Sequence, residues 1–292
     1  MNLGGKNNMK ILVTGAKGQL GKKIIDVLGK EHQLVLTDYD NMDITDIKAI
    51  RAVVEKEKPD YIIHGAAYTQ VDKAEENTEL CRKVNSFGTK NIATIAEEYD
   101  IKLIYISTDF VFDGLKKLPY NEKDFANPLS VYGLTKYEGE EFIREICSKY
   151  YIIRVAWLYG ELPIGHPGTN FVEVMLKLAS EKPTLSVIND QIGSPTYTGD
   201  LVEIISKTII QSPEFGTYHF SGTSPCSWYD FAKEIFTQAN VEIDLRPITS
   251  SEYPQKAQRP MYSYLDKTKI ENALNIKVKP WQKMLEEYLS KR

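Results

Sequence analysis

The 292-residue sequence has few of the residues that build metal centres and disulfide frameworks. Its three cysteines, Cys81, Cys147 and Cys226, are odd in number and widely scattered, which predicts reduced thiols in a cytoplasmic protein. Its four histidines are dispersed too, and none falls at the spacing of a zinc-binding motif. We therefore expect no metal site.

Long apolar runs and an excess of positive charge are also missing. No stretch approaches the ~18 consecutive apolar residues of a membrane-spanning helix, and the N-terminus has no apolar segment of the kind found in secretory signals. Acidic residues outnumber basic ones by 40 to 36, so the formal net charge of −4 gives no basic footprint for nucleic acid. We expect neither a membrane nor a nucleic-acid partner, and we expect residues 1–8 to be a disordered extension.

What the sequence does contain is a regular alternation of short apolar and amphipathic segments. Strands are predicted at residues 10–14, 33–37, 61–64, 101–106 and 151–155, and helices at 19–30, 46–57, 84–99 and 130–149. This alternation is typical of an α/β protein with a doubly wound parallel sheet of the Rossmann type. We predict a dinucleotide-binding domain over residues 9–159.

After residue 159 the pattern loosens. A flexible loop is predicted at 160–168, helices at 170–180, 200–210, 227–238 and 280–290, and strands at 183–187 and 216–220. We predict that residues 160–292 form a smaller α/β lobe that mainly binds substrate, and the chain can cross between the two lobes. The cleft between them is the expected site.

A glycine-rich turn joins the first predicted strand to the first predicted helix. Gly15, Gly18 and Gly21 have the spacing G-x-x-G-x-x-G, and Gln19 and Leu20 open the helix. Glycines let the backbone approach a pyrophosphate closely, and the free N–H groups of a helix N-terminus attract its charge. The turn predicts a dinucleotide site, although a purely structural turn fits the same spacing.

Residues after the second and third strands extend this predicted cofactor site. Asp38 ends the second strand, where a carboxylate binds a ribose 2′-hydroxyl and repels a 2′-phosphate, which favours NADH. Asp43 and Ile44 follow within reach of an adenine ring, and the small Ala66 and Ala67 let the chain pass close to a cofactor. The acidic cluster also fits turn chemistry, and the alanines also fit tight packing.

Tyr132 and Lys136 lie four residues apart on a predicted helix and so share one face. An ammonium beside a phenol lowers the phenol pKa, so that Tyr132 can exchange a proton with a carbonyl oxygen near neutral pH. Thr108, at the end of a buried strand, offers a hydroxyl to the same oxygen, and Asp109 is either a substrate ligand or a loop-capping acid. Alone, the Tyr–Lys pair also fits a solvated helix face; together with the glycine-rich turn and Thr108 it predicts an oxidoreductase.

This order of motifs is the pattern of extended short-chain dehydrogenases/reductases. More closely, the sequence resembles the dTDP-4-dehydrorhamnose reductase family from about Met9 to the last predicted helix. The segments that carry the resemblance are GAKGQLG at 15–21, AAYTQVDKAE at 66–75, YISTDFVFDG at 105–114, VYGLTKYEGE at 131–140, RVAWLYG at 154–160, NF at 170–171, TLSVINDQIGSPT at 184–196 and RP at 259–260. The segments of the second half make the resemblance specific, because they lie outside the shared cofactor fold.

The resemblance implies an activity and roles for the catalytic residues. It implies reduction of the C4 keto group of dTDP-4-dehydrorhamnose to dTDP-L-rhamnose, a precursor of cell-wall polysaccharide, by hydride from NADH or NADPH. Tyr132 would donate a proton to the C4 oxygen, Lys136 would bind the nicotinamide ribose and lower the Tyr132 pKa, and Thr108 would orient the carbonyl.

The resemblance also implies residues that hold the dTDP-sugar. Asp109 would touch the sugar and Trp157 would pack against its ring. Asn170, Asn189 and Arg259 would hold the nucleotide side, and the fork geometry of Arg259 suits a diphosphate. Trp157 also fits a core aromatic, and the other three also fit structural contacts.

Two features limit what the resemblance implies. Some members are described as magnesium-dependent dimers with an acid on the first helix, where this sequence has Lys22 and Lys23; we therefore expect no metal-bridged dimer, but a monomer or weak homodimer. Family members often accept NADPH, whereas Asp38 favours NADH. We expect both cofactors to be used, with Lys17 or Lys22 tolerating a 2′-phosphate.

Other functions fit the same fold. One is a different sugar-nucleotide 4-ketoreductase, 4-epimerase or 4,6-dehydratase; a dehydratase needs an acid/base pair directly after the strand-end threonine, and here Asp109 is followed by Phe110 instead of glutamate. An epimerase would keep NAD+ tightly bound. A non-catalytic regulatory subunit is a further alternative, which the intact Tyr132, Lys136 and Thr108 disfavour.

Overall fold

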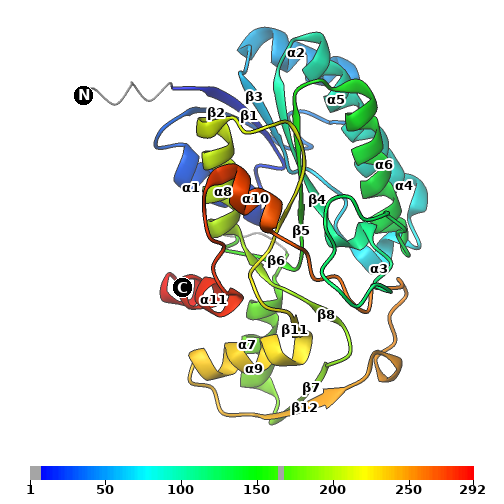
Figure 1. The fold of residues 1–292 in the computed structure, drawn as a ribbon, viewed down its shortest axis with the longest axis vertical. Coiled ribbons are helices and arrows are strands. Elements are labelled where there is room, and N and C mark those ends of the chain that lie inside the picture. Colours follow the sequence, from blue (N-terminus) through cyan, green and yellow to red (C-terminus); the bar gives the residue numbers. More distant parts are fainter. Residues whose placement is uncertain (1–7, 164–167) are drawn as a thin grey trace.

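The structure is a computed structural model that describes residues 8–163 and 168–292. The predicted disordered extension at 1–8 lies, up to residue 7, outside the described residues, and so does the part of the predicted 160–168 loop at 164–167. Figure 1 shows a large sheet flanked by helices in the upper part of the molecule and a smaller group of helices and strands below it.

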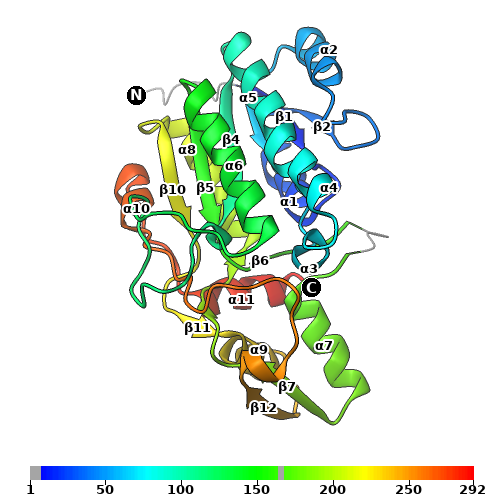
Figure 2. The same cartoon turned by 90° about the vertical axis from the view of Figure 1, so that its right-hand side faces the viewer.

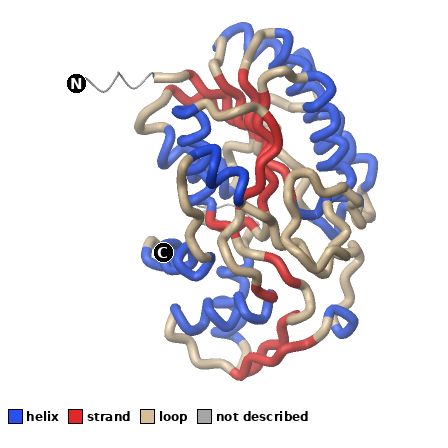
Figure 3. The backbone as a smooth tube through the Cα atoms, viewed as in Figure 1, coloured by secondary structure: helices blue, strands red, loops and turns tan. Residues whose placement is uncertain are grey.

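Six parallel strands form the large sheet (Figure 3). They are β1 (Lys10–Thr14), β2 (Gln33–Thr37), β3 (Tyr61–His64), β4 (Lys102–Thr108), β5 (Tyr150–Val155) and β10 (Gly216–Phe220), in the order β10-β5-β4-β3-β1-β2. The strand order reverses direction next to β1, which is how a doubly wound sheet is built. The predicted fold class is confirmed.

Helices cover both faces of this sheet, because successive residues of a strand point to opposite sides. Ile11 and Val13 of β1 pack into a core with α1 (Gln19–Leu28) and α8 (Thr198–Gln211). Leu12, between them, packs into a second core with α2 (Ile47–Glu57) and α5 (Thr89–Glu98). The helix α6 (Val131–Ile146) packs against α5 and so belongs to the second face.

The smaller part lies beyond the carboxyl ends of the large sheet (Figure 2). It contains α7 (Phe171–Glu181), α9 (Trp228–Gln238) and α11 (Trp281–Ser290), and the two-stranded pairs β7 (Thr184–Ile188) with β12 (Asp244–Ile248), β6 (Leu158–Tyr159) with β9 (Thr196–Tyr197), and β8 (Ile192–Gly193) with β11 (Cys226–Ser227). Between them the chain returns to the large part with α8 and β10, and again with α10 (Thr268–Leu274). The chain thus crosses between the two parts.

The helical region before β4 differs from its prediction. Instead of one helix over 84–99, the chain forms α3 (Val71–Ala74), α4 (Thr78–Arg82), a π-helical turn at Lys83–Gly88 and then α5. Gly88 lies so close to Ile44 that a Cβ atom would meet its Cδ1 at 2.9 Å. Gly88, in the π-helical turn, thus packs tightly against the loop after β2. π-Helical turns are often found near functional sites.

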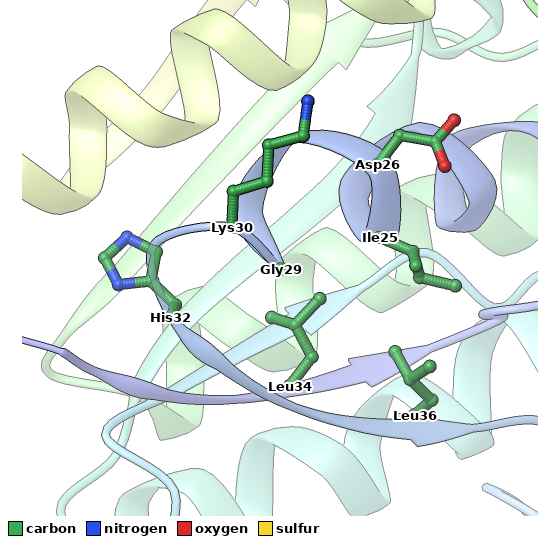
Figure 4. A pocket seen from close by; sticks show the side chains of 7 residues that line it. All are labelled: Ile25, Asp26, Gly29, Lys30, His32, Leu34 and Leu36. Atoms are coloured by element: carbon green, nitrogen blue, oxygen red, sulfur yellow. The ribbon is translucent and has the colours of Figure 1, made fainter.

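A shallow hollow of about 570 Å³ lies between α1 and the edge strand β2 (Figure 4). Its apolar floor comes partly from Leu36, which is 39% exposed. The residues that line it are Ile25, Asp26, Gly29, Lys30, His32, Leu34 and Leu36. None of the predicted site residues lines this hollow, so the predicted chemistry lies elsewhere.

A buried lysine near α10 gives a first testable prediction. Lys267 is 5% exposed, and its Nζ has no hydrogen-bond partner among the described residues and lies 3.6 Å from the ring centre of Tyr264. Burial lowers the pKa of Lys267 from 10.5 to about 7. The unfolded chain binds the Lys267 proton more strongly than the folded chain does. The free energy of unfolding should therefore rise as pH increases from about 7 to 10.5, and below pH 7 the full cost of burying the charged amine lowers the stability.

We expect Lys267→Met to stabilise the protein. One pKa unit corresponds to ~1.4 kcal/mol, so the buried charge of Lys267 costs ~5 kcal/mol below pH 7. Loss of the contact with the Tyr264 ring offsets ~1–2 kcal/mol of this gain. The expected gain in the free energy of unfolding is therefore about 3–4 kcal/mol at pH 6, and it should disappear near pH 10.5. Urea unfolding at several pH values measures it, and an equal gain at every pH would contradict the explanation.

Candidate active site

The glycine-rich turn lies at the carboxyl end of β1, where its backbone approaches the loop after β3. Gly15 has φ +72°, and a Cβ atom there would come within 2.8 Å of the Ala66 nitrogen. Only glycine fits this left-handed, crowded position without strain. Gly18 is the N-cap of α1, and no side chain caps the first N–H groups of this helix. This arrangement can hold a pyrophosphate.

Asp38 lies beside this turn, where the sequence placed it. Its Oδ2 accepts a hydrogen bond from the Lys17 backbone N–H at 3.0 Å, and its Oδ1 accepts one from the Tyr39 N–H at 2.9 Å. The carboxylate therefore braces the glycine-rich turn. The Lys17 ammonium pairs with Asp40 at 2.6 Å on the surface, and such exposed pairs contribute little and exchange readily.

The remaining predicted cofactor residues lie around the same edge of the sheet. Asp43 is exposed and its Oδ1 accepts from the Thr45 N–H at 2.8 Å, whereas Ile44 is buried. Ala66 is half-buried and donates its N–H to Thr14 Oγ1 at 3.1 Å, and Ala67 follows it at the start of the loop. Gln19 donates to the Leu158 carbonyl at 3.2 Å, which links the first turn of α1 to the strand after β5.

The first turn of α6 brings Tyr132 to the end of β4. Ser130 caps the helix by accepting from the Gly133 N–H at 3.2 Å. A Cβ atom at Gly133 would lie 2.2 Å from the Phe110 carbonyl oxygen, so glycine is needed for α6 to approach this closely. The Tyr132 ring then meets Phe110 edge to face, with 5.6 Å between ring centres.

Tyr132 and Thr108 interact directly. The Thr108 hydroxyl lowers the pKa of the Tyr132 phenol, but burial and the nearby Asp109 outweigh it, so the pKa of Tyr132 lies above its usual value of 10. Thr108 ends β4 and its Oγ1 also accepts from the Phe110 N–H at 3.2 Å. The two hydroxyls converge at the carboxyl edge of the sheet, where ligands of such folds bind.

Lys136 is buried one turn after Tyr132. Its Nζ donates to the Ile106 carbonyl at 2.7 Å and lies 4.1 Å from the ring centre of Tyr105. Burial lowers the pKa of Lys136 to about 7, against the opposing charge of Glu140. In the ligand-free chain burial dominates the pKa of Tyr132 and the Lys136 Nζ is bound to a backbone carbonyl, so the lowering of the Tyr132 pKa by Lys136 stays a prediction.

A buried ionic cluster lies directly beneath this pair. Glu140, fully buried one turn after Lys136, accepts from Arg154 Nε at 2.9 Å and Nη2 at 2.6 Å, from Arg144 Nη2 at 2.5 Å and from Ser107 Oγ at 2.5 Å. Burial opposes ionisation of Glu140, but the charges of Arg154 and Arg144 prevail and lower its pKa to about 2. The cluster ties α6, β4 and β5 together behind the reactive groups.

Asp109 lies on the inner side of Thr108. It is 1% exposed, its Oδ1 accepts from Thr108 Oγ1 at 3.2 Å, and its Oδ2 accepts from Ser263 Oγ at 2.5 Å. Burial raises the pKa of Asp109 to about 7, although the hydrogen bonds from Ser263 and Thr108 oppose the rise. The carboxyl predicted to touch the sugar is thus engaged with two protein hydroxyls in the ligand-free chain.

Comparisons with known proteins identify the family. The model of the RmlD substrate binding domain family matches residues 9–292. The chain belongs to this family. It is 39% identical to "dTDP-4-dehydrorhamnose reductase" of Aggregatibacter actinomycetemcomitans, over 94% of this chain and 97% of the relative. It is 39% identical to "Spore coat polysaccharide biosynthesis protein SpsK" of Bacillus subtilis (strain 168), over 97% and 98%.

A solved structure of a family member has nearly the same fold. The crystal structure of dTDP-4-dehydrorhamnose reductase from Bacillus anthracis, in complex with NADP, superposes with a TM-score of 0.93 at 40% identity and covers 98% of this chain and 100% of that one. The match to the RmlD family therefore extends over both parts of the chain. It includes the segments at 154–160 and 184–196, which made the sequence resemblance specific.

Trp157 is the predicted substrate residue with the most unusual backbone in this member of the RmlD family. It has φ +48°, a left-handed conformation that is uncommon for a bulky residue. Its ring stacks on Trp228 with 3.7 Å between ring centres, and a Cβ atom at Gly193 would lie 2.7 Å from the indole. The indole is half-buried, so one part of it stays exposed between fixed neighbours. Strain of this kind is found at ligand sites.

The other three predicted nucleotide residues differ in their surroundings. Asn170 is buried and caps α7; its Nδ2 donates to the Gly160 carbonyl at 2.8 Å and to Tyr288 at 3.2 Å. Asn189 is exposed after β7. Arg259 is bound in bidentate fashion by Asp72 of α3, at 3.0 and 2.7 Å. The structure thus brings Arg259 to the loop after β3, whereas Asn170 is engaged with the protein itself.

Several residues of the site were missed by the sequence reasoning. Asn85, in the π-helical turn, donates to the Tyr68 carbonyl at 3.1 Å and accepts from its N–H at 2.7 Å. His64 bridges Thr14 and Thr89 at 2.8 and 3.0 Å, and burial with the charge of Lys136 lowers its pKa to about 3, so it is neutral. The only sequence signal for His64 was its place at the end of a predicted strand.

Within residues 8–163 and 168–292 there is no group of three or more His, Cys, Asp or Glu side chains arranged to hold a metal ion. In the same part of the chain, no helix has the length and apolar character needed to cross a membrane. The lysines predicted to replace a metal-binding acid form ion pairs: Lys22 with Asp26 at 2.8 Å and Lys23 with Glu161 at 2.7 Å.

Proposed function

We propose that this chain reduces the C4 keto group of dTDP-4-dehydrorhamnose to dTDP-L-rhamnose, with NADPH or NADH as the hydride donor. The observation that carries the proposal is the convergence of Tyr132, Thr108 and Lys136 at the carboxyl edge of the sheet, next to the glycine-rich turn, in a member of the RmlD family. Relatives over nearly the whole chain are named dTDP-4-dehydrorhamnose reductase, and one of them was solved with NADP.

In this proposal Tyr132 and Thr108 act on the C4 oxygen of the substrate, and Lys136 acts on the cofactor. The bound cofactor supplies the hydride. Tyr132 donates its phenolic proton to the C4 oxygen, and its raised pKa keeps that proton in place until charge develops on the oxygen. Thr108 donates a hydrogen bond to the same oxygen. Lys136, which rests on a backbone carbonyl in the ligand-free chain, holds the nicotinamide ribose.

The two ends of the ligands are held by the residues around the edge. The pyrophosphate of the cofactor is held by the glycine-rich turn: Gly15, Gly18, Gln19, Leu20 and Gly21. The adenosine part of the cofactor is held by residues after the second and third strands: Asp38, Asp43, Ile44, Ala66 and Ala67. Trp157 packs on the sugar ring, Asp109 lies next to Thr108, and Arg259, Asn189 and Asn170 serve the dTDP side. The product supplies rhamnose for a polysaccharide. We propose that the enzyme acts in the cytoplasm as a monomer or weak homodimer, which sedimentation at several concentrations tests.

One assay tests the reaction, the substrate and the cofactor together. The purified chain is mixed with dTDP-4-dehydrorhamnose, and the loss of absorbance of NADPH and NADH is followed separately. We expect turnover with both cofactors and dTDP-L-rhamnose as the product by mass spectrometry. No loss with either cofactor would overturn the proposal, and NAD+ that stays bound through purification would favour a 4-epimerase.

Asp38 is expected to set the preference between the two cofactors. Replacing Asp38 by alanine removes the acceptor for a ribose 2′-hydroxyl and the repulsion toward a 2′-phosphate. We expect kcat/KM for NADH to fall about tenfold, as for loss of a hydrogen bond to a charged group, and that for NADPH to rise because the repulsion is removed. Asp244→Ala, at an exposed aspartate of β12, serves as the control, and equal losses for the two cofactors would contradict the assignment.

A further inference from the structure

Asp109 is a buried carboxyl that the proposed reaction does not yet use. It has 1% exposure and both of its oxygens are engaged, one by Thr108 of its own strand end and the other by Ser263, which is 154 residues away in the chain. Buried acids with such partners tend to hold a proton near neutral pH.

A continuous row of hydroxyl and carboxyl groups leads from Tyr132 into the protein. The Tyr132 phenol interacts with the Thr108 hydroxyl, Thr108 Oγ1 lies 3.2 Å from Asp109 Oδ1, and Asp109 Oδ2 lies 2.5 Å from Ser263 Oγ. Each neighbouring pair can exchange a proton along a hydrogen bond. Asp109 is the only carboxyl in this row and the only member that can release a proton near neutral pH, because the others are hydroxyls and the pKa of the Tyr132 hydroxyl is raised further.

We propose that Asp109 is the proton store that restores Tyr132 through Thr108, and that Ser263 positions the Asp109 carboxyl for this role. This inference rests on the proposed function, since it concerns the proton that the reduction consumes. Asp109 does not touch the reacting atoms and acts through Thr108, so it is a positioning and relay residue.

The proton count of the proposed steps is balanced. The phenolic O–H of Tyr132 breaks as a new O–H forms on the C4 oxygen, which has gained negative charge from the hydride. The Thr108 proton then passes to the Tyr132 oxygen, and the proton on Asp109 Oδ1 passes to Thr108 Oγ1. In the protonated state the Asp109 carboxyl therefore donates to Thr108, which is opposite to the direction of this hydrogen bond in the structure. Asp109 is left as a carboxylate that accepts hydrogen bonds from Thr108 and Ser263, as the structure shows, and it regains one proton from solvent along the same row after product release. One proton is consumed per carbonyl reduced.

The surroundings of Asp109 are suited to storing a proton. From α6 the titratable group that faces it is the Tyr132 phenol, and from the C-terminal segment the facing group is the uncharged Ser263 hydroxyl. From its own segment come the Thr108 hydroxyl and the backbone N–H groups of Asp109 and Phe110, which favour the carboxylate. Burial raises the pKa of Asp109 to about 7, so the acid and the carboxylate are both accessible near neutral pH.

The first test measures the carboxyl directly in the ligand-free protein. Protein labelled with ¹³C at aspartate carboxyl carbons is titrated by NMR, and the Asp109 signal is assigned by its loss in Asp109→Asn. We expect this signal to titrate near pH 7, and to titrate at higher pH in Ser263→Ala, because a donor to the carboxylate has been removed. Ser194→Ala is the control: it removes an equally buried hydroxyl that donates to the Gly222 carbonyl, and it should leave the Asp109 titration unchanged.

The second test follows kcat against pH with saturating NADPH and dTDP-4-dehydrorhamnose. We expect kcat of the unmodified chain to fall as pH rises through the Asp109 titration, and this fall to move to higher pH in Ser263→Ala. In Asp109→Asn we expect kcat to drop about tenfold at pH 6, at the lower end of general acid effects, and the fall near pH 7 to vanish. NADPH binding, measured by fluorescence, should persist in both variants.

The outcomes separate the relay from the proposed reaction. If the unmodified chain reduces the keto sugar but the fall near pH 7 persists unmoved in both variants, the relay is wrong and the proposed function stands. An Asp109 signal that titrates below pH 5 also overturns the relay. If the unmodified chain reduces no keto sugar at all, the proposed function fails, and the relay fails with it.

Discussion

Replacing Tyr132 by phenylalanine should lower kcat for the keto sugar by about 10²–10⁴-fold, the range expected when a general acid is removed. The substitution keeps the ring, which meets Phe110 edge to face, and removes only the hydroxyl that interacts with Thr108. The backbone of the glycine-rich turn and the Lys136 ammonium are unchanged. NADPH should therefore bind about as tightly as before, and the loss should appear in the chemical step.

Stopped-flow absorbance with enzyme in excess measures this step, and fluorescence titration measures NADPH binding. Tyr137→Phe is the matched control, because Tyr137 lies on the same helix but its ring packs against Arg144, with 5.9 Å from the guanidinium carbon to the ring centre. It should keep turnover within about twofold, as for a surface change. A Tyr132→Phe variant with near-normal turnover would show that the proton comes from elsewhere.

Replacing Arg154 by methionine should have the largest effect on stability. The guanidinium is 3% exposed and makes two hydrogen bonds to the fully buried Glu140 carboxylate. Breaking a buried ion pair from one side costs about 3–5 kcal/mol, and because Glu140 keeps the partly exposed Arg144 as a partner we expect the lower end of this range. With about 2–4 °C per kcal/mol for a chain of this size class, the melting temperature should fall by roughly 6–12 °C.

Two further variants test whether the buried Glu140 charge, left with Arg144 alone, is the cause. The double variant Arg154→Met with Glu140→Gln removes the charge that was left behind, and we expect it to recover part of the lost stability. Arg246→Met removes a guanidinium from an exposed pair with Asp244, and we expect little change. Scanning calorimetry measures all three. A double variant that is less stable than Arg154→Met would contradict this explanation.

Much of the large sheet could be predicted from the sequence because its strands are buried apolar runs. The strands β1, β2, β3 and β10 begin and end at the predicted residues. The sequence could not show that β10 pairs with β5, since nothing local marks a partner more than 60 residues away. The two-residue strands β6, β8, β9 and β11 are too short to produce an alternating pattern.

The site was predictable where its groups follow one another closely in the chain. Tyr132 and Lys136 share a helical face, and the glycine-rich turn has a recognisable spacing. The direction of the Lys136 side chain was not predictable, because it depends on the Ile106 carbonyl of another element. Ser263 and Asp72 gave no signal either, because their roles come from contacts with Asp109 and Arg259 that span 154 and 187 residues.

These long-range contacts have a consequence for protein synthesis. The segment around Arg259 and Ser263 lies against the loops after β3 and β4, although both loops leave the ribosome much earlier. A nascent chain can already contain the glycine-rich turn, Thr108 and Tyr132. At that stage Asp109 still lacks its partner Ser263, and Asp72 lacks Arg259. Closing such long loops is slow compared with local folding. The contacts of Asp109 with Ser263 and of Asp72 with Arg259 therefore form late. An unfinished chain on the ribosome contains the glycine-rich turn before its catalytic site is complete.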